Sequence, residues 1–384
     1  MTTLTRIVRL CAVLQCLLTA SVLAAGSIDN LPGEPGTTLP AIKAAQGSSY
    51  LLYIPKNIKR HKNYALFFYT NSGGGNQGQV NLFKEAADIT GVLVAVSVES
   101  KNGRDTKEND ASIADALRHL NKTIPIDQNR IWFGGSSGGA RVAYRNNARH
   151  KGAGVLAIVA GTNDPKERRK GDYFMINGGH DYNRYESAKT VLQLKSQATQ
   201  RYYPGGHGGC PGWLHTEGLV WLVGRKLKPG CDRMDKPGSR PGSTPGQSGM
   251  NSGGSWDKDE ILAYEANVLD WIERMKAKDP HRAYYWCLFL QCGNVAGAES
   301  SQRLKALVAE LGKEPGNKQY VDGIRDLDEL ARNTVATALP AKGSASAHSS
   351  PVLSKKAASL ERSYKGTSWI EDCCKALQKP TDKF

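Results

Sequence analysis

Between residues 49 and 225 the sequence alternates short apolar runs with longer amphipathic stretches. The apolar runs are of strand length, are rich in β-branched or aromatic residues and are bounded by Gly, Pro or Asn; they lie at 49–55, 65–70, 92–98, 130–135, 154–160, 173–178 and 199–204. Such uninterrupted runs are typical of strands that are buried on both faces of a parallel sheet. Helices are expected between them, at about 81–90, 108–122, 139–149, 185–198 and 212–226. This rhythm predicts an α/β domain with a doubly wound, mostly parallel sheet.

The rest of the 384-residue chain divides into segments of different composition. Residues 1–25 carry two arginines, a short apolar run and then small residues, which is the pattern of a cleaved signal peptide. A membrane anchor is the alternative, but the apolar run is shorter than the roughly 20 residues that a span needs. Residues 26–232 hold the predicted α/β domain, and 233–256 form a Gly/Pro/Ser-rich linker. We expect residues 257–335 to be helical, and 336–384 to be an Ala/Ser-rich linker with a cysteine-containing tail.

The signal peptide predicts export, to a periplasmic or extracellular location where cysteines can form disulfides. Without Cys11 and Cys16 of the signal peptide, six cysteines remain: Cys210, Cys231, Cys287, Cys292, Cys373 and Cys374. They lack the two-residue spacing and the neighbouring histidines of a zinc site, so disulfides are favoured over a metal. A bond between Cys210 and Cys231 would close a local loop. Cys287 and Cys292 could pair with each other or with the adjacent Cys373 and Cys374.

The formal net charge of +15, or +13 without the two arginines of the signal peptide, favours anionic surfaces as partners. The positive charge is scattered over clusters such as NIKRHK and DPKERRK. No basic recognition helix and no aromatic-interleaved RNA-binding motif accompanies them, so we do not expect a nucleic acid as the natural partner. After the signal peptide, no segment of the sequence is apolar enough to predict a membrane span.

Three of the predicted strands end in residues that can carry catalytic chemistry. The fourth apolar run leads into GGSSGG, and a G-x-S-x-G turn between a strand and a helix exposes the oxygen of its serine. Because Ser136 and Ser137 both satisfy the glycine spacing, the motif alone leaves two candidate nucleophiles. Asp181 follows the sixth run and His207 the last one. Taken singly, the aspartate could cap a helix and the histidine could be a surface residue.

The three residues occur in the order serine, acid, histidine along the chain, each after the end of a predicted strand. This is the chain order of the α/β-hydrolase triad. The carboxyl ends of parallel strands meet at one edge of a sheet, so the three side chains are expected to lie together there. A glycine-rich turn of this kind can also bind phosphate, but no Lys-Ser/Thr pair follows it, which excludes a P-loop. The pattern therefore predicts a serine hydrolase.

The stretch RIWFGGSSGGARVA resembles the RIYLAGFSGGARVA elbow of bacterial α/β hydrolases related to polyhydroxybutyrate depolymerase and feruloyl-esterase-type proteins. GGHDYNRYE resembles the acid segment of that family, and YPGGHGGCPGW resembles its histidine loop. The resemblance covers roughly residues 48–225. One departure is clear: the run at 65–70 is followed by NSGGG and not by the His-Gly pair that is usual in these enzymes.

The resemblance implies that the second serine, Ser137, is the nucleophile, that Asp181 is the acid and that His207 is the base. It also implies a carboxylic ester as the substrate, with a polymer or a component of the cell envelope among the options. Attack on an ester creates an oxyanion that requires preorganised N–H donors. We expect these to be the backbone N–H groups of Gly138, the residue after the nucleophile, and of Ser72.

The predicted chemistry requires no metal and no organic cofactor. Two other functions remain open on the sequence. A serine peptidase of the same fold would use the same triad. A hydrolase-like binding protein would instead recognise an envelope polymer through its basic surface and its helical C-terminal region.

Overall fold

The computed structural model describes residues 31–59, 63–162, 164–167, 171–227, 257–292, 295–330, 332–333 and 350–381. The predicted signal peptide, the predicted linker at 233–256 and Cys231 lie outside the described residues.

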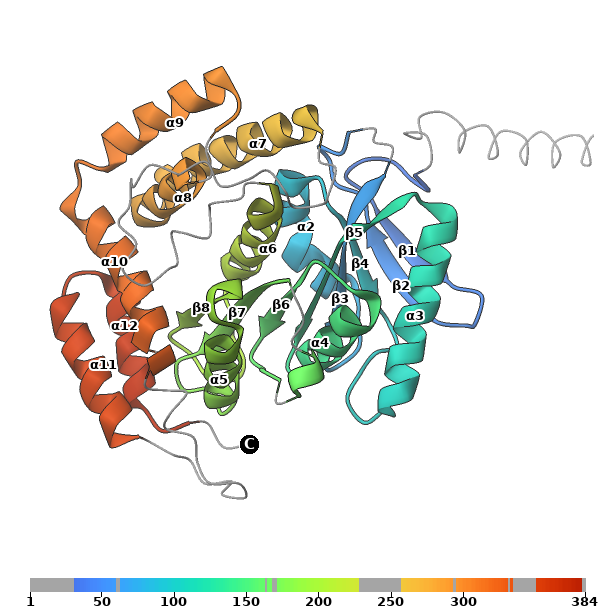
Figure 1. Cartoon of the computed structure of the whole chain (residues 1–384), viewed down its shortest axis with the longest axis horizontal. Coiled ribbons are helices and arrows are strands. Elements are labelled where there is room, and N and C mark those ends of the chain that lie inside the picture. The colour runs from blue at the N-terminus through green and yellow to red at the C-terminus, as the bar shows by residue number, and fades with distance from the viewer. Residues whose placement is uncertain are drawn as a thin grey trace, which may run out of the picture.

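An eight-stranded sheet forms the centre of the molecule, with the strand order β1-β2-β4-β3-β5-β6-β7-β8 (Figure 1). Its strands are β1 (Thr38–Lys43), β2 (Ser49–Tyr53), β3 (Tyr64–Asn71), β4 (Leu93–Ser97), β5 (Ile126–Ser136), β6 (Gly154–Ile158), β7 (Asp172–Gly178) and β8 (Ala198–Tyr203). β1 pairs antiparallel with β2 and β2 pairs antiparallel with β4, whereas the strands from β4 to β8 are parallel. This order and the mostly parallel pairing are those of the α/β-hydrolase fold, and the predicted fold class is confirmed.

The sheet is covered on both faces, which explains the uninterrupted apolar runs. Helices α2 (Gln77–Thr90) and α6 (Gly212–Leu227) lie on one face, and α3 (Thr106–Thr123), α4 (Gly138–His150) and α5 (Arg184–Leu194) lie on the other. In β3, Phe67 and Tyr69 belong to the core of the first face, and Leu66 and Phe68 to that of the second. Strand β1 was missed by the sequence interpretation because it is a half-exposed edge strand without an apolar run.

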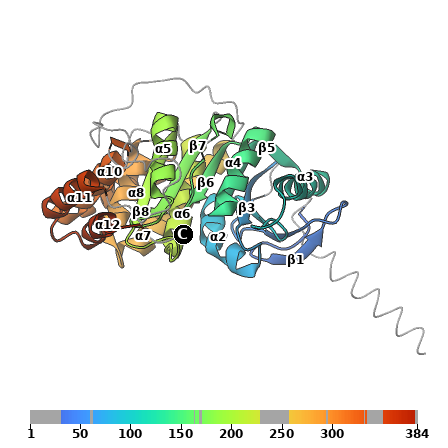
Figure 2. The same cartoon turned by 90° about the horizontal axis from the view of Figure 1, so that it is seen from below.

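In the described part of the chain, six further helices follow the sheet: α7 (Lys258–Lys276), α8 (Pro280–Cys292), α9 (Ala298–Leu311), α10 (Pro315–Leu330), α11 (Pro351–Ser363) and α12 (Ser368–Gln378). Of these, α7 lies over α2 and α6, and α10 and α12 lie on the β8 side (Figures 1 and 2). The apolar side chains of the six helices belong to the same continuous core as α2 and α6. Tyr264 of α7 donates a hydrogen bond to the carbonyl of Val220 in α6 (3.1 Å), and Trp286 of α8 donates one to the carboxylate of Glu217 (3.0 Å). The C-terminal helices therefore complete the core of the α/β fold.

Strand β8 ends the sheet, and the C-terminal helices cover its open edge. The carboxylate of Asp328 in α10 accepts a hydrogen bond from the backbone N–H of Gln200 at 3.1 Å. Arg332 donates to the carbonyl of Lys195, just before the strand, at 2.9 Å. Covering an edge strand in this way satisfies backbone groups that could otherwise pair with another chain.

The expected disulfides are not seen: no disulfide joins the five cysteines that the structure describes. Cys287 and Cys292 both lie on α8, five residues apart, which separates them by roughly 7.5 Å along the helix axis. A disulfide joins Cα atoms only about 4.4–6.8 Å apart, so these two cannot pair without unwinding the helix. Cys373 and Cys374 are fully buried in the core. Burial raises the pKa of the Cys287 and Cys374 thiols to about 12, so both stay protonated.

The expected pair of Cys210 and Cys231 cannot be placed within the described residues, because Cys231 lies outside them. Within the part of the chain that the structure covers, no helix has both the length and the apolar character of a membrane span.

Candidate active site

The strand-to-helix turn between β5 and α4 has a backbone conformation that is unusual for a serine. Ser137 has φ 55° and ψ −121°, in a region that residues other than glycine rarely adopt. Its N–H donates to the carbonyl of Ile158 in β6 (2.9 Å), and its own carbonyl accepts a hydrogen bond from the N–H of Ala140 in α4 (3.0 Å). The turn is thus anchored on both sides. Strain of this kind, maintained by surrounding contacts, is characteristic of functional sites.

Two glycines allow the turn to close. A Cβ atom on Gly135 would lie 2.3 Å from the carbonyl oxygen of Gly139, and one on Gly139 would lie 2.4 Å from that of Thr70 in β3. Each is closer than any side chain tolerates, so both positions require glycine. The two glycines flank Ser137 symmetrically, whereas Ser136 is the last residue of β5. Gly134 and Gly138, which flank Ser136, are crowded by side-chain atoms of Phe67 and Asn102 and not by the backbone. The backbone contacts and the positive φ of Ser137 therefore favour the frame Gly135-x-Ser137-x-Gly139.

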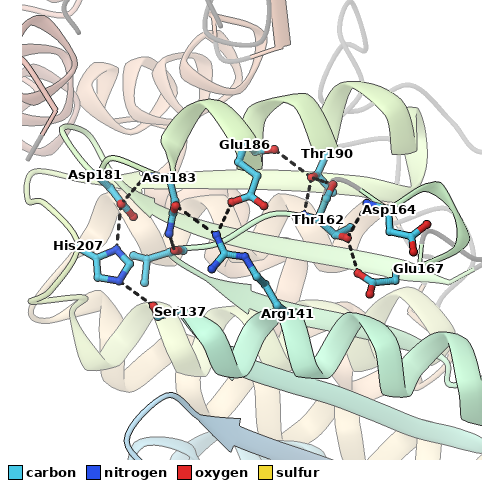
Figure 3. A network of polar contacts seen from close by, with 11 residues as sticks. Ser137, Arg141, Thr162, Asp164, Glu167, Asp181, Asn183, Glu186, Thr190 and His207 are labelled. Atoms are coloured by element: carbon cyan, nitrogen blue, oxygen red, sulfur yellow. Dashed lines mark hydrogen bonds and ion pairs between the residues drawn. The ribbon is translucent and has the colours of Figure 1, made fainter. Parts of the chain in front are cut away.

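The structure brings Ser137, His207 and Asp181 together at the carboxyl edge of the sheet (Figure 3). Nε2 of His207 lies 2.9 Å from Oγ of Ser137, and Nδ1 of His207 lies 3.0 Å from Oδ1 of Asp181. The carboxylate is fully buried, and the imidazole is 26% exposed. When a hydroxyl, an imidazole and a carboxylate are hydrogen-bonded in this order, the serine can pass its proton to the histidine.

Asn183 fixes the place of the acid. Its backbone N–H donates to Oδ1 of Asp181 at 2.9 Å, and its side chain donates to the carbonyl of Val159 at 2.7 Å. Arg141 of α4 reaches Oδ1 of Asn183 at 3.4 Å and the carboxylate of Glu186 at 2.8 Å (Figure 3). The sequence analysis missed Asn183 and Arg141. An asparagine two residues after the acid, at the start of a helix, is indistinguishable in sequence from an ordinary helix cap.

Tyr182 packs against His207, and Cys210 follows the histidine in the same loop. The Tyr182 ring stacks on the imidazole, with 4.2 Å between the centroids and 21° between the planes, and so restricts rotation of the ring. Cys210 follows three residues after the histidine. Burial raises the pKa of its thiol to about 12, so it is not a thiolate nucleophile at neutral pH.

The two residues expected to bind the oxyanion lie on either side of Ser137. Gly138 is the first residue of α4, whose first turn has no side-chain cap in the described structure. Asn71 of β3 is in register with Ser136 of β5, so Ser72 follows in the row beside Ser137. The amide N–H groups of the next three residues are occupied: Gly73 donates to the Asn71 side chain, Gly74 to the Asn71 carbonyl and Gly75 to the Val98 carbonyl. Among the described residues, the Ser72 N–H has no such acceptor.

Asn102, from the loop after β4, lies over the same turn. Its backbone N–H donates to the Ser72 carbonyl at 2.8 Å, and a Cβ atom on Gly138 would lie 1.9 Å from its side-chain Oδ1. A side chain at position 138 would therefore displace the side chain of Asn102. Asn102 carried no signal in the sequence, because long-range backbone contacts, its own bond to Ser72 and the bridge between Gly73 and Lys101, bring its loop to the nucleophile.

No protein-family model and no curated protein matches the chain. Solved structures that resemble it include a hyperthermophilic esterase from Pyrobaculum calidifontis, with 12% identity and a TM-score of 0.40 over 50% of this chain and 83% of that one. An arylesterase has 12% identity and a TM-score of 0.39 over 51% and 88% of the two chains. A putative dipeptidyl aminopeptidase IV from Bacteroides ovatus has 15% identity and a TM-score of 0.39 over 49% and 36%.

The strand order, the strained turn after β5, and the acid and histidine after β7 and β8 define the chain as a protein of the α/β-hydrolase fold. Its assignment to the polyhydroxybutyrate-depolymerase-related family rests on the sequence motifs alone and stays a prediction.

Proposed function

We propose that the protein is a serine hydrolase that cleaves carboxylic esters through an acyl-enzyme. The observation that carries the proposal is the continuous hydrogen-bonded series from Ser137 Oγ through the His207 imidazole to the buried Asp181 carboxylate. A serine hydroxyl is a poor nucleophile at neutral pH unless a neighbouring base removes its proton during the attack. A neutral His207, with its Nδ1 proton directed at Asp181, presents a basic Nε2 to that hydroxyl.

The proposed reaction proceeds in two halves. Ser137 Oγ bonds to the ester carbonyl carbon while its proton passes to His207, and the carbonyl oxygen becomes an oxyanion. Collapse of this intermediate breaks the bond to the alcohol, which leaves with the proton from His207. Water, deprotonated by His207, then attacks the acyl-enzyme by the same route and releases the carboxylic acid. Asp181 maintains the tautomer of the imidazole and stabilises its cationic form throughout.

The choice of esters over amides is supported by the motif resemblance, since the triad chemistry is common to both. The predicted signal peptide adds the expectation that the reaction takes place outside the cytoplasm. A serine peptidase and a non-catalytic binding protein are the outcomes against which the proposal is tested.

The test uses the full chain with p-nitrophenyl esters of increasing acyl length and with aminoacyl p-nitroanilides. We expect turnover of the esters, with a preference for one acyl length, and no measurable turnover of the anilides. Faster cleavage of the anilides would identify a peptidase. Folded protein that cleaves neither and does not react with a fluorophosphonate would indicate the binding function.

The oxyanion donors can be tested at Ser72. Replacing Ser72 with proline removes its N–H and should lower kcat by roughly 10²–10³-fold, the usual effect of losing one such donor. Ser72→Ala keeps the N–H and should retain wild-type kcat. Steady-state kinetics on the best p-nitrophenyl ester measure both, with thermal melts to show that the loop variants fold. A large loss in Ser72→Ala would instead identify the hydroxyl as the donor.

A further inference from the structure

The last helix of the chain, α12, packs directly against the loop that carries Asp181. A Cβ atom on Gly179, two residues before the acid, would lie 2.5 Å from the Cβ of Ala376 and 3.1 Å from the backbone nitrogen of Leu377. The backbone of the loop at Gly179 therefore packs directly against α12, because glycine has no side chain to separate them. Any change in the position of α12 must be transmitted to the loop, because closely packed interiors leave no free volume.

A buried arginine joins the same loop to the end of α12. Arg184, the first residue of α5, is fully buried and donates to the carbonyl of Gly179. It also donates to the carbonyl of Lys379, 195 residues away, at 3.3 Å. Lys379 is the C-cap of α12. A cation at the C-terminus of a helix interacts favourably with its dipole and satisfies its last carbonyls.

The histidine side of the site lies against α12 as well. The thiol of Cys373 lies 3.3 Å from the carbonyl oxygen of Tyr202 in β8, the strand that leads to His207. Trp369 packs edge-on against Trp213, which follows the histidine loop, with 4.8 Å between the ring centroids.

The acid loop and the histidine loop are bonded to each other. Gly179 N–H donates to the carbonyl of Tyr203 at 2.9 Å, and His180 N–H donates to that of Gly205 at 3.1 Å. Helix α12 therefore lies behind both loops at once.

We propose that α12 is a positioning element of the active site, which sets the place of the Asp181 carboxylate relative to His207. The proposal rests on the proposed hydrolase function. It gives the C-terminal region a role in turnover although none of the residues in the triad or at the two expected oxyanion donors comes from it. A misplacement of about 1 Å at a catalytic group can lower the rate by roughly 10²-fold, so a small shift of the loop has a measurable effect.

The test exploits the contact between Gly179 and Ala376. Gly179 does not have a positive φ, so alanine suits its backbone and disturbs only the contact with α12. We expect Gly179→Ala to lower kcat by roughly 10²-fold with little change in KM. Adding Ala376→Gly removes the closest clash and should restore kcat to within a few-fold of wild type. Ala376→Gly alone should keep wild-type kcat.

Two further variants separate positioning from stability. Ala376→Val increases the bulk from the helix side and should lower kcat like Gly179→Ala, so the proposal does not depend on one variant folding. Leu353→Ala removes a fully buried side chain of α11 that belongs to the same core. It should lower the melting temperature without lowering kcat.

The second readout is the one-dimensional proton NMR resonance of the hydrogen bond between His207 Nδ1 and Asp181, which needs no substrate. We expect it to shift or broaden in Gly179→Ala and to return in the double variant. Wild-type kcat and an unchanged resonance in Gly179→Ala, or a loss that Ala376→Gly does not restore, would overturn the proposal. If the protein proves not to hydrolyse esters or amides, this resonance still reports whether α12 positions the acid.

Discussion

Replacing Ser137 with alanine is expected to reduce kcat by about 10⁶-fold, as loss of the nucleophile does in a serine hydrolase. The reason is that Ser137 Oγ is the hydroxyl in contact with Nε2 of His207, at 2.9 Å. The Cys210 thiol, three residues after His207 in the chain, stays protonated because burial raises its pKa to about 12. The variant should also lose all labelling by a fluorophosphonate, which reports the nucleophile independently of the substrate.

Ser136→Ala is the matched control for this prediction. Ser136 is chemically identical and adjacent, but it belongs to β5, where it is in register with Ile158 of the neighbouring strand. We expect Ser136→Ala to keep fluorophosphonate labelling and kcat within a few-fold of wild type. The opposite pattern, with labelling lost in Ser136→Ala and kept in Ser137→Ala, would refute the assigned frame.

Replacing Asp181 with asparagine should lower kcat by about 10⁴-fold while leaving KM nearly unchanged. The carboxylate is fully buried, and its Oδ1 accepts hydrogen bonds from both His207 and the Asn183 N–H. An amide has almost the same shape but carries no negative charge to stabilise the imidazolium that forms during the attack. The effect is therefore on the transition state and not on the binding of the substrate.

Asp164→Asn provides the control for the Asp181 variant. Asp164 is an exposed carboxylate in the loop after β6, near the same network (Figure 3). Its side chain accepts a hydrogen bond from the backbone N–H of Lys166 at 2.8 Å. The Asp164→Asn substitution removes one negative charge, as Asp181→Asn does, but Asp164 does not contact the imidazole. We therefore expect kcat close to that of wild type. An Asp181→Asn variant that folds and keeps more than a tenth of wild-type kcat would show that this carboxylate is not the acid of a triad.

Much of the fold could be predicted because its elements carry local signals. Each inner strand is an apolar run that both faces of the sheet bury, and each crossover helix has an amphipathic pattern. Strand β1 and helix α11 were missed for the same local reason, because each buries few apolar side chains. β1 is half-exposed and lacks such a run, and α11 buries only Leu353 and Ala357 against the core.

The candidate site could be predicted only in part. Ser137, Asp181 and His207 follow strands and share a chain order, so they carry a signal in the sequence. Tyr182 and Asn183 lie in the GGHDYNRYE stretch, but the motif does not say what they contact, and Asn102 carries no signal at all. The importance of all three comes from what folding places beside them. The pairings expected among Cys287, Cys292, Cys373 and Cys374 are not seen for the same reason, since an even number of cysteines says nothing about the distances between them.

By itself, the sequence determined the α/β rhythm, the three strand ends that carry reactive side chains and a glycine motif that admits two serines. These are local properties, because the spacing of apolar residues and turn chemistry act over a few residues. Only the tertiary structure decided that Gly135 and Gly139 meet the neighbouring backbone, which assigns the strained position to Ser137. The tertiary structure alone also showed that α12 packs behind the acid loop. There, Arg184 donates a hydrogen bond to Lys379, which lies 195 residues away in the sequence. Such contacts depend on how whole elements pack, and close packing has no counterpart in local sequence pattern.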